Sequence, residues 1–85
     1  MQGDIVLVHA AGSGVGIAAT QLAIGLGARV VAVAGDDDKL ANSQRLGAFA
    51  TVNYKKIPDF AAAIMEATEG KGVNLILDPV LKLPG

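Results

Sequence analysis

The chain has 85 residues, 52% of them hydrophobic, and a formal net charge of −1 at pH 7. This size suits one small domain, and the charge excludes the strongly basic surface that binds nucleic acid or an anionic membrane. With no cysteine, one histidine and no apolar run near the roughly 18 residues of a membrane span, we expect a soluble cytoplasmic protein without a metal site.

The first three predicted elements are a strand, a helix and a second strand. The apolar run IVLVH predicts a strand over residues 5–9 that is buried on both faces. Apolar residues interspersed with alanines predict a helix over residues 15–26, which ends at Gly27. The β-branched run RVVAVA predicts the second strand over residues 29–34.

The remainder of the chain repeats this alternation. An acidic run at residues 36–38 marks the start of a second helix, because the helix dipole favours negative charge there, and we expect that helix to end at Gly47. The stretch FATVN predicts a third strand over residues 49–53, residues 58–70 predict a third helix, and VNLIL predicts a fourth strand over residues 73–77.

The predicted order of elements is therefore βαβαβαβ within one unit, residues 1–85. Strands that are nearly continuous apolar runs, each followed by a helix, indicate a parallel sheet covered on both faces. Right-handed crossovers favour the strand order 3-2-1-4. We thus expect an α/β, Rossmann-like sheet of four parallel strands with helices on both faces, and an exposed edge at the fourth strand unless another strand adjoins it.

The stretch HAAGSGVG, residues 9–16, joins the first strand to the first helix with very little side chain. Amides at a helix N-terminus bind phosphate, and small residues let a pyrophosphate approach. The dinucleotide fingerprint G-x-G-x-x-G is only partly met, since Ala11 and Ser13 replace its first two glycines. A tight turn without a ligand is the alternative. The residues that we expect at a pyrophosphate are Ser13, Gly14, Val15 and Gly16.

Five stretches of the sequence together resemble a known family: GDIVLVHAAGSGVGIAATQLA, GARVVAVAG, KL…LGA, NY and GKGVNLILDPV. They are similar to the cofactor-binding segment of the zinc-free medium-chain dehydrogenases/reductases, in the NADPH-dependent quinone oxidoreductase branch that includes zeta-crystallin. Because members of that family are several times longer, the resemblance implies a fragment of a longer, homo-oligomeric oxidoreductase. It also implies that the catalytic residues lie outside this segment, so none is assigned here.

The resemblance further implies which cofactor binds. An acidic residue at the end of the second strand holds the ribose 2′-OH of NAD, but the matching position here is Ala34, followed by Gly35. Related quinone reductases hold the 2′-phosphate of NADPH with a lysine and a tyrosine, which match Lys39 and Tyr54. We therefore expect NADP(H), with Gly35, Lys39 and Tyr54 at the phosphate. The acidic run 36–38 opposes this choice, and NAD(H) becomes possible if one carboxylate turns onto the ribose.

Three further residues have supporting roles, and two further functions stay open. Lys55 and Lys56 add positive charge beside Tyr54, and His9 is expected to have a packing role at the end of a buried strand. Besides an NADP(H)-binding segment of a quinone oxidoreductase, the sequence leaves open an enoyl-reductase segment of a lipid or polyketide synthase. A non-catalytic folding or binding module is the third possibility.

Overall fold

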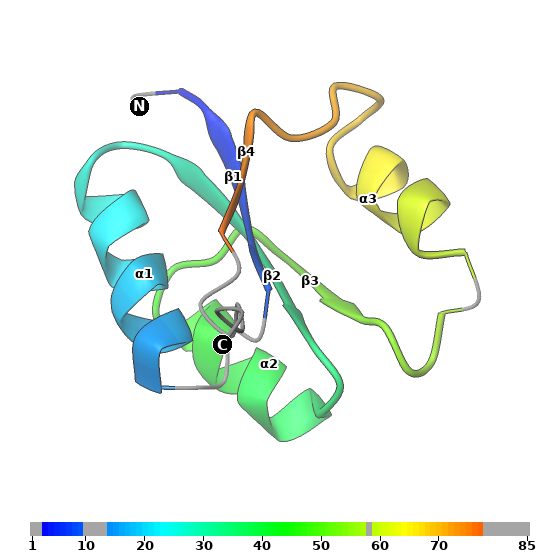
Figure 1. Cartoon of the computed structure of the whole chain (residues 1–85), viewed down its shortest axis with the longest axis horizontal. Coiled ribbons are helices and arrows are strands. Elements are labelled where there is room, and N and C mark those ends of the chain that lie inside the picture. Colours follow the sequence, from blue (N-terminus) through cyan, green and yellow to red (C-terminus); the bar gives the residue numbers. More distant parts are fainter. Residues whose placement is uncertain (1–2, 10–13, 58, 78–85) are drawn as a thin grey trace, which may run out of the picture.

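Strands and helices alternate along the chain in the computed structural model, which describes residues 3–9, 14–57 and 59–77 (Figure 1). The strands are β1 (Ile5–His9), β2 (Arg29–Ala34), β3 (Ala50–Asn53) and β4 (Leu75–Leu77). The helices are α1 (Gly14–Gly25), α2 (Asp37–Arg45) and α3 (Phe60–Ala67). Every predicted element is present, with ends within three residues of the expected ones. Among these described residues, no helix is both long and apolar enough to cross a bilayer.

All neighbouring strands of the sheet run parallel, in the order β3-β2-β1-β4. The predicted topology is thereby confirmed. The register places His9 opposite Val33 and Ala34 opposite Asn53. Because the strands are parallel, the carboxyl ends of β1, β2 and β3 meet at one edge of the sheet, which we call the carboxyl edge.

The sheet is covered on both faces, as the near-continuous apolar strands predicted. Alternate residues of a strand point to opposite faces, so the strands contribute side chains to two separate apolar clusters. One cluster joins Val8 and Val30 to Ala23 of α1 and Leu40 of α2. The other cluster joins Ile64 of α3 to five buried strand residues, which are Ile5, Leu7, Val31, Val33 and Val52. Helices α1 and α2 therefore cover one face and α3 the other (Figure 1).

Helix α2 is polar, and two features fix its position. At its start, the N–H of Asp38 donates a hydrogen bond of 2.9 Å to the Asp36 carboxylate, which caps the helix. On its inner side, Leu40 is only 5% exposed and packs into the apolar cluster under α1 and α2. The first turn of α2 is therefore held at the carboxyl edge by one cap and one apolar anchor.

Strand β4 forms the outer edge of the sheet and pairs only with β1 among the described strands. Its residue Ile76 is 62% exposed, in agreement with the expected open edge. The strand is two residues shorter at its start than predicted, and Asn74, directly before it, bonds to the start of β1. The N–H of Ile5 donates to Asn74 Oδ1 at 2.8 Å, and the N–H of Asn74 donates to the Ile5 carbonyl at 2.7 Å.

Candidate functional site

The N-terminus of α1 lies close to the carboxyl end of β1, as the glycine-rich stretch predicted. Gly14 and Val15 are exposed and Gly16 is buried. Among the described residues, no atom lies within 4 Å of a Cβ atom placed on Gly14, so these residues leave the space beside the start of α1 open. Ser13, the fourth residue expected here, lies outside the described residues. An open helix N-terminus at the carboxyl edge favours a negatively charged group.

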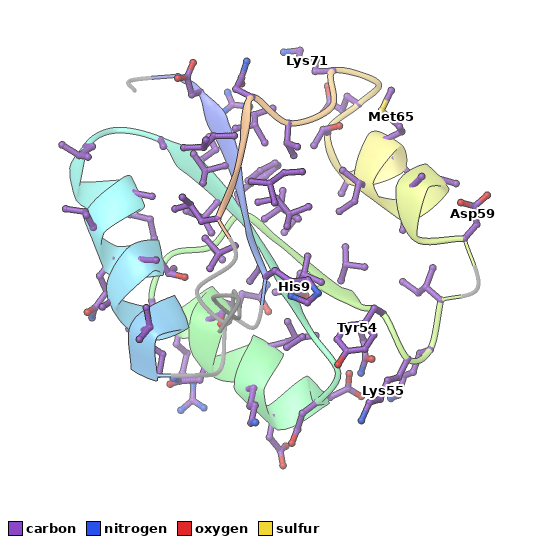
Figure 2. All side chains as sticks on the ribbon, in the orientation of Figure 1. His9, Tyr54, Lys55, Asp59, Met65 and Lys71 are labelled. Carbon is purple, nitrogen blue, oxygen red and sulfur yellow. The ribbon has the colours of Figure 1, made fainter. Side chains whose placement is uncertain are left out.

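Gly35, directly after β2, lies beneath two side chains from the end of β3. A Cβ atom placed on it would stand 2.8 Å from Lys55 Cε and 3.0 Å from Tyr54 Cζ. Absence of a side chain at position 35 is what allows Tyr54 and Lys55 to approach the backbone so closely. The structure thus brings together Gly35 and Tyr54, two of the predicted site residues. It adds Lys55, which sequence analysis treated only as nearby charge (Figure 2).

The ring of Tyr54 is stacked on the imidazole of His9. Their ring centroids are 5.8 Å apart and their planes differ by 21°. The backbone N–H of Tyr54 also donates to the Ala34 carbonyl at 3.3 Å. Tyr54 remains 44% exposed, so part of it faces solvent at the carboxyl edge. The imidazole of His9 therefore packs against this aromatic ring (Figure 2).

Two of the three acidic residues at the start of α2 are engaged by other groups of the protein. The Asp36 carboxylate caps α2, and Asp37 accepts a hydrogen bond of 2.8 Å from Asn53 Nδ2 and a second from the ammonium of Lys56. The bonds from Lys56 and then from Asn53 lower the pKa of the Asp37 carboxyl below its usual value. The same carboxylate raises the pKa of Lys56. Asp37 is therefore an ionised carboxylate whose charge is balanced by a neighbouring cation.

Asn53 was not identified from the sequence, although it connects several parts of the site. It is the last residue of β3 and is 8% exposed. Its Oδ1 accepts a hydrogen bond from the N–H of Lys55 at 3.0 Å, and its Nδ2 donates to Asp37. The signal that the sequence offered was a polar amide at the end of an otherwise apolar strand.

Lys39 is the third residue of α2 and is exposed. Its carbonyl accepts a hydrogen bond of 3.1 Å from Ser43 Oγ. Within the described part of the chain, no hydrogen bond or ion pair joins its ammonium to Gly35 or Tyr54. Lys39 therefore belongs to the same helix turn as Asp37, and its contact with a ligand stays a prediction.

A small hollow, the amino-edge hollow, lies at the opposite end of the strands. Its volume of about 20 Å³ is near that needed for a single water molecule. It lies beside the pair formed by Arg29 and Phe49, whose guanidinium carbon is 5.9 Å from the ring centroid. The residues that line it are Ile5, Arg29, Phe49, Ala67, Thr68, Glu69 and Lys71. This hollow is far too small for a dinucleotide.

Comparison with known proteins gives relatives for nearly the whole chain. A family model described as "Zinc-binding dehydrogenase" matches residues 14–82. The chain is 39% identical over 80 residues to the 2-haloacrylate reductase of Burkholderia sp, covering 94% of this chain and 24% of that protein.

Solved structures also match most of the chain. The chain is similar to an NAD-dependent alcohol dehydrogenase, with 51% identity, a TM-score of 0.81 and coverage of 88% of this chain and 22% of that one. It is also similar to the quinone oxidoreductase of Escherichia coli complexed with NADPH, with 33% identity, a TM-score of 0.84 and coverage of 95% and 24%. The chain thus spans about a quarter of the length of these relatives.

The description of the matching family names zinc, and the residues of this chain do not fit a zinc site. The sequence contains no cysteine and a single histidine. Among the residues that the structure describes, no group of three His, Cys, Asp or Glu side chains could hold a metal ion. Zinc in proteins normally takes three or four such ligands. No step of the chemistry is therefore assigned to a metal held by this segment.

Proposed function

This chain belongs to the zinc-binding dehydrogenase family and is a cofactor-binding segment of such oxidoreductases, and from this premise we propose that it binds NADP(H) within a longer reductase similar to the quinone oxidoreductases. The observation that carries the proposal is the position of Gly35 beneath Tyr54 and Lys55. A phenol and an ammonium gathered at the end of β2 are suited to the 2′-phosphate of NADPH, since an ammonium and a hydroxyl both donate to phosphate oxygens.

Two of the three acidic groups near Gly35 support the same choice. Enzymes that prefer NAD place a carboxylate at the end of the second strand, where it binds the ribose 2′-OH. Here Ala34 and Gly35 stand at that end, while Asp36 caps α2 and Asp37 is bonded to Lys56 and Asn53. Neither of these two carboxylates is left uncommitted for a ribose.

The relatives use both cofactors, so the preference depends on local side chains. One solved relative is an NAD-dependent alcohol dehydrogenase, whereas the Escherichia coli quinone oxidoreductase was solved in complex with NADPH. For the pyrophosphate we propose the N-terminus of α1, with Gly14, Val15 and Gly16. Ser13 joins this set on the sequence motif. A bound nicotinamide would supply hydride, while the residues of this chain bind and orient the adenosine and pyrophosphate.

The proposal is tested first at Lys39, which the resemblance assigns to the phosphate. Replacing this exposed lysine with alanine removes one hydrogen bond to a charged group, which stabilises by about 1.5 kcal/mol or more. We expect NADPH affinity to fall about tenfold and NADH affinity to stay unchanged, both measured by titrating the purified chain.

Lys71→Ala is the matched control for this test. Lys71 is also an exposed lysine, but it lines the amino-edge hollow at the other end of the strands (Figure 2). We expect it to change neither affinity. An equal loss of NADPH and NADH binding in Lys39→Ala would contradict the assignment of Lys39 to the phosphate.

A further inference from the structure

The side-chain amide of Asn53 uses both of its ends to hold different parts of the candidate site. Its Oδ1 accepts from the N–H of Lys55 at 3.0 Å, and its Nδ2 donates to Asp37 Oδ1 at 2.8 Å. Its backbone carbonyl accepts from the N–H of Lys56 at 3.1 Å. Since Asn53 is buried at the end of β3, these bonds fix the turn 54–56 against the first turn of α2.

We propose that Asn53 is a positioning residue that selects the phosphorylated cofactor, acting through Lys55 on one side and through Asp37 on the other. This inference rests on the proposed NADP(H) site. It goes beyond that site by assigning the choice of cofactor to a buried amide, in addition to the groups that contact the phosphate.

The first part of the role of Asn53 is to position the side chain of Lys55. The Lys55 side chain lies over Gly35 because its own backbone is held by the Asn53 amide. Without that amide, the N–H of Lys55 loses its acceptor, and the turn is held over Gly35 by the 3.3 Å bond from Tyr54 to Ala34 and by the stack on His9. A phosphate would then meet a lysine whose position is less well fixed.

The second part of the role of Asn53 is to hold the carboxylate of Asp37. Asp37 begins α2 only two residues after Gly35, close to where a carboxylate would bind an unphosphorylated ribose. The Asn53 amide and the Lys56 ammonium hold this carboxylate on the side of β3. Released from Asn53, Asp37 would be freer to bind a ribose hydroxyl and to repel a phosphate, and both effects favour NADH.

Asparagine is the residue type that this arrangement requires. Its side chain provides one acceptor and one donor group, whereas an ionised aspartate provides acceptors only. Asn53→Asp would therefore keep the bond from the Lys55 N–H but place a second carboxylate against Asp37. Asn53→Ala would remove both bonds. The two variants consequently separate the two parts of the role.

The experiment measures NADPH and NADH affinities of the 85-residue chain, together with hydrogen exchange at the Lys55 amide. In Asn53→Ala we expect NADPH affinity to fall about tenfold, as for the loss of a hydrogen bond near a charged group, with NADH affinity unchanged or increased and faster exchange at Lys55. In Asn53→Asp we expect at least the same fall in NADPH affinity while the Lys55 amide remains protected.

Two further variants make the test specific. Asn74→Ala also removes a side-chain amide bonded to a backbone N–H, that of Ile5, but at the opposite edge of the sheet. We expect it to leave the ratio of NADPH to NADH affinity unchanged.

Combining Asn53→Asp with Asp37→Asn restores one donor and one acceptor, and we expect part of the NADPH preference to return. This pair keeps the proposal testable should Asn53→Ala fail to fold.

The possible results are distinguishable. An Asn53→Ala chain that folds and keeps its affinity ratio, or loses both cofactors equally, would overturn the role of Asn53 and leave the proposed function intact. A double variant with no recovery would also count against it. A wild-type chain that binds NADH at least as tightly as NADPH would overturn the proposed function itself, and with it the selection assigned to Asn53.

Discussion

Replacing Tyr54 with phenylalanine and Lys55 with methionine in one chain should weaken NADPH binding by about a hundredfold and leave NADH binding nearly unchanged. Each change removes one hydrogen bond to the 2′-phosphate, worth about 1.5 kcal/mol at the lower end for a charged partner, and 3 kcal/mol corresponds to about a hundredfold. The lower end applies because Tyr54 and Lys55 are exposed.

The chosen replacements preserve the shape of the site. Phenylalanine keeps the ring that stacks on His9, and methionine keeps a long side chain over Gly35. Parallel titrations with NADPH and NADH measure the effect, and NADH serves as the internal control because it lacks the 2′-phosphate. Unchanged NADPH affinity in the double variant would remove Tyr54 and Lys55 from the phosphate site.

The second large effect concerns stability. Leu40→Ala should lower the free energy of unfolding by about 2–5 kcal/mol, the cost of cutting a buried leucine down to alanine. Leu40 is the large apolar side chain by which α2 packs into the core. The free energy of unfolding of a small domain is only a few kcal/mol, so the variant should unfold at a much lower urea concentration.

Leu22→Ala on α1 is the matched control for this measurement. Leu22 is 66% exposed, so the same change of side chain should shift the free energy of unfolding by about 0.5 kcal/mol or less. Equal effects of the two substitutions would show that Leu40 does not anchor α2. Because the first turn of α2 carries Asp37 and Lys39, Leu40→Ala should also reduce the preference for NADPH in any chain that stays folded.

The fold could be predicted from the sequence because its signals are local. Apolar runs such as IVLVH mark strands that are buried on both faces, and Gly27 and Gly47 mark the ends of helices. Both glycines have positive φ values, 86° and 115°, which L-residues rarely adopt. The main difference lies at the start of β4, where Asn74 bonds across to Ile5. That contact joins residues 69 positions apart, and no local pattern reports it.

The site was predictable only in part, for the same reason. Gly35 and Tyr54 were identified from short motifs, and the structure brings them together. The bond from Asn53 to Asp37 joins residues 16 positions apart, and the position of Lys55 over Gly35 depends on a side-chain conformation. Neither can be inferred from spacing along the chain. From the sequence, the acidic run was expected to start a helix and to oppose a phosphate, and the structure adds that Asp36 and Asp37 have partners within the protein.

The central claim is that the carboxyl edge of this sheet binds NADP(H), and a titration of the isotope-labelled chain followed by NMR chemical shifts tests it most directly. We predict saturable binding of NADPH, weaker binding of NADH, and the largest shift changes at Gly14, Gly35, Tyr54 and Lys55. Absence of saturable binding, or shift changes confined to the amino-edge hollow around Arg29, would contradict it.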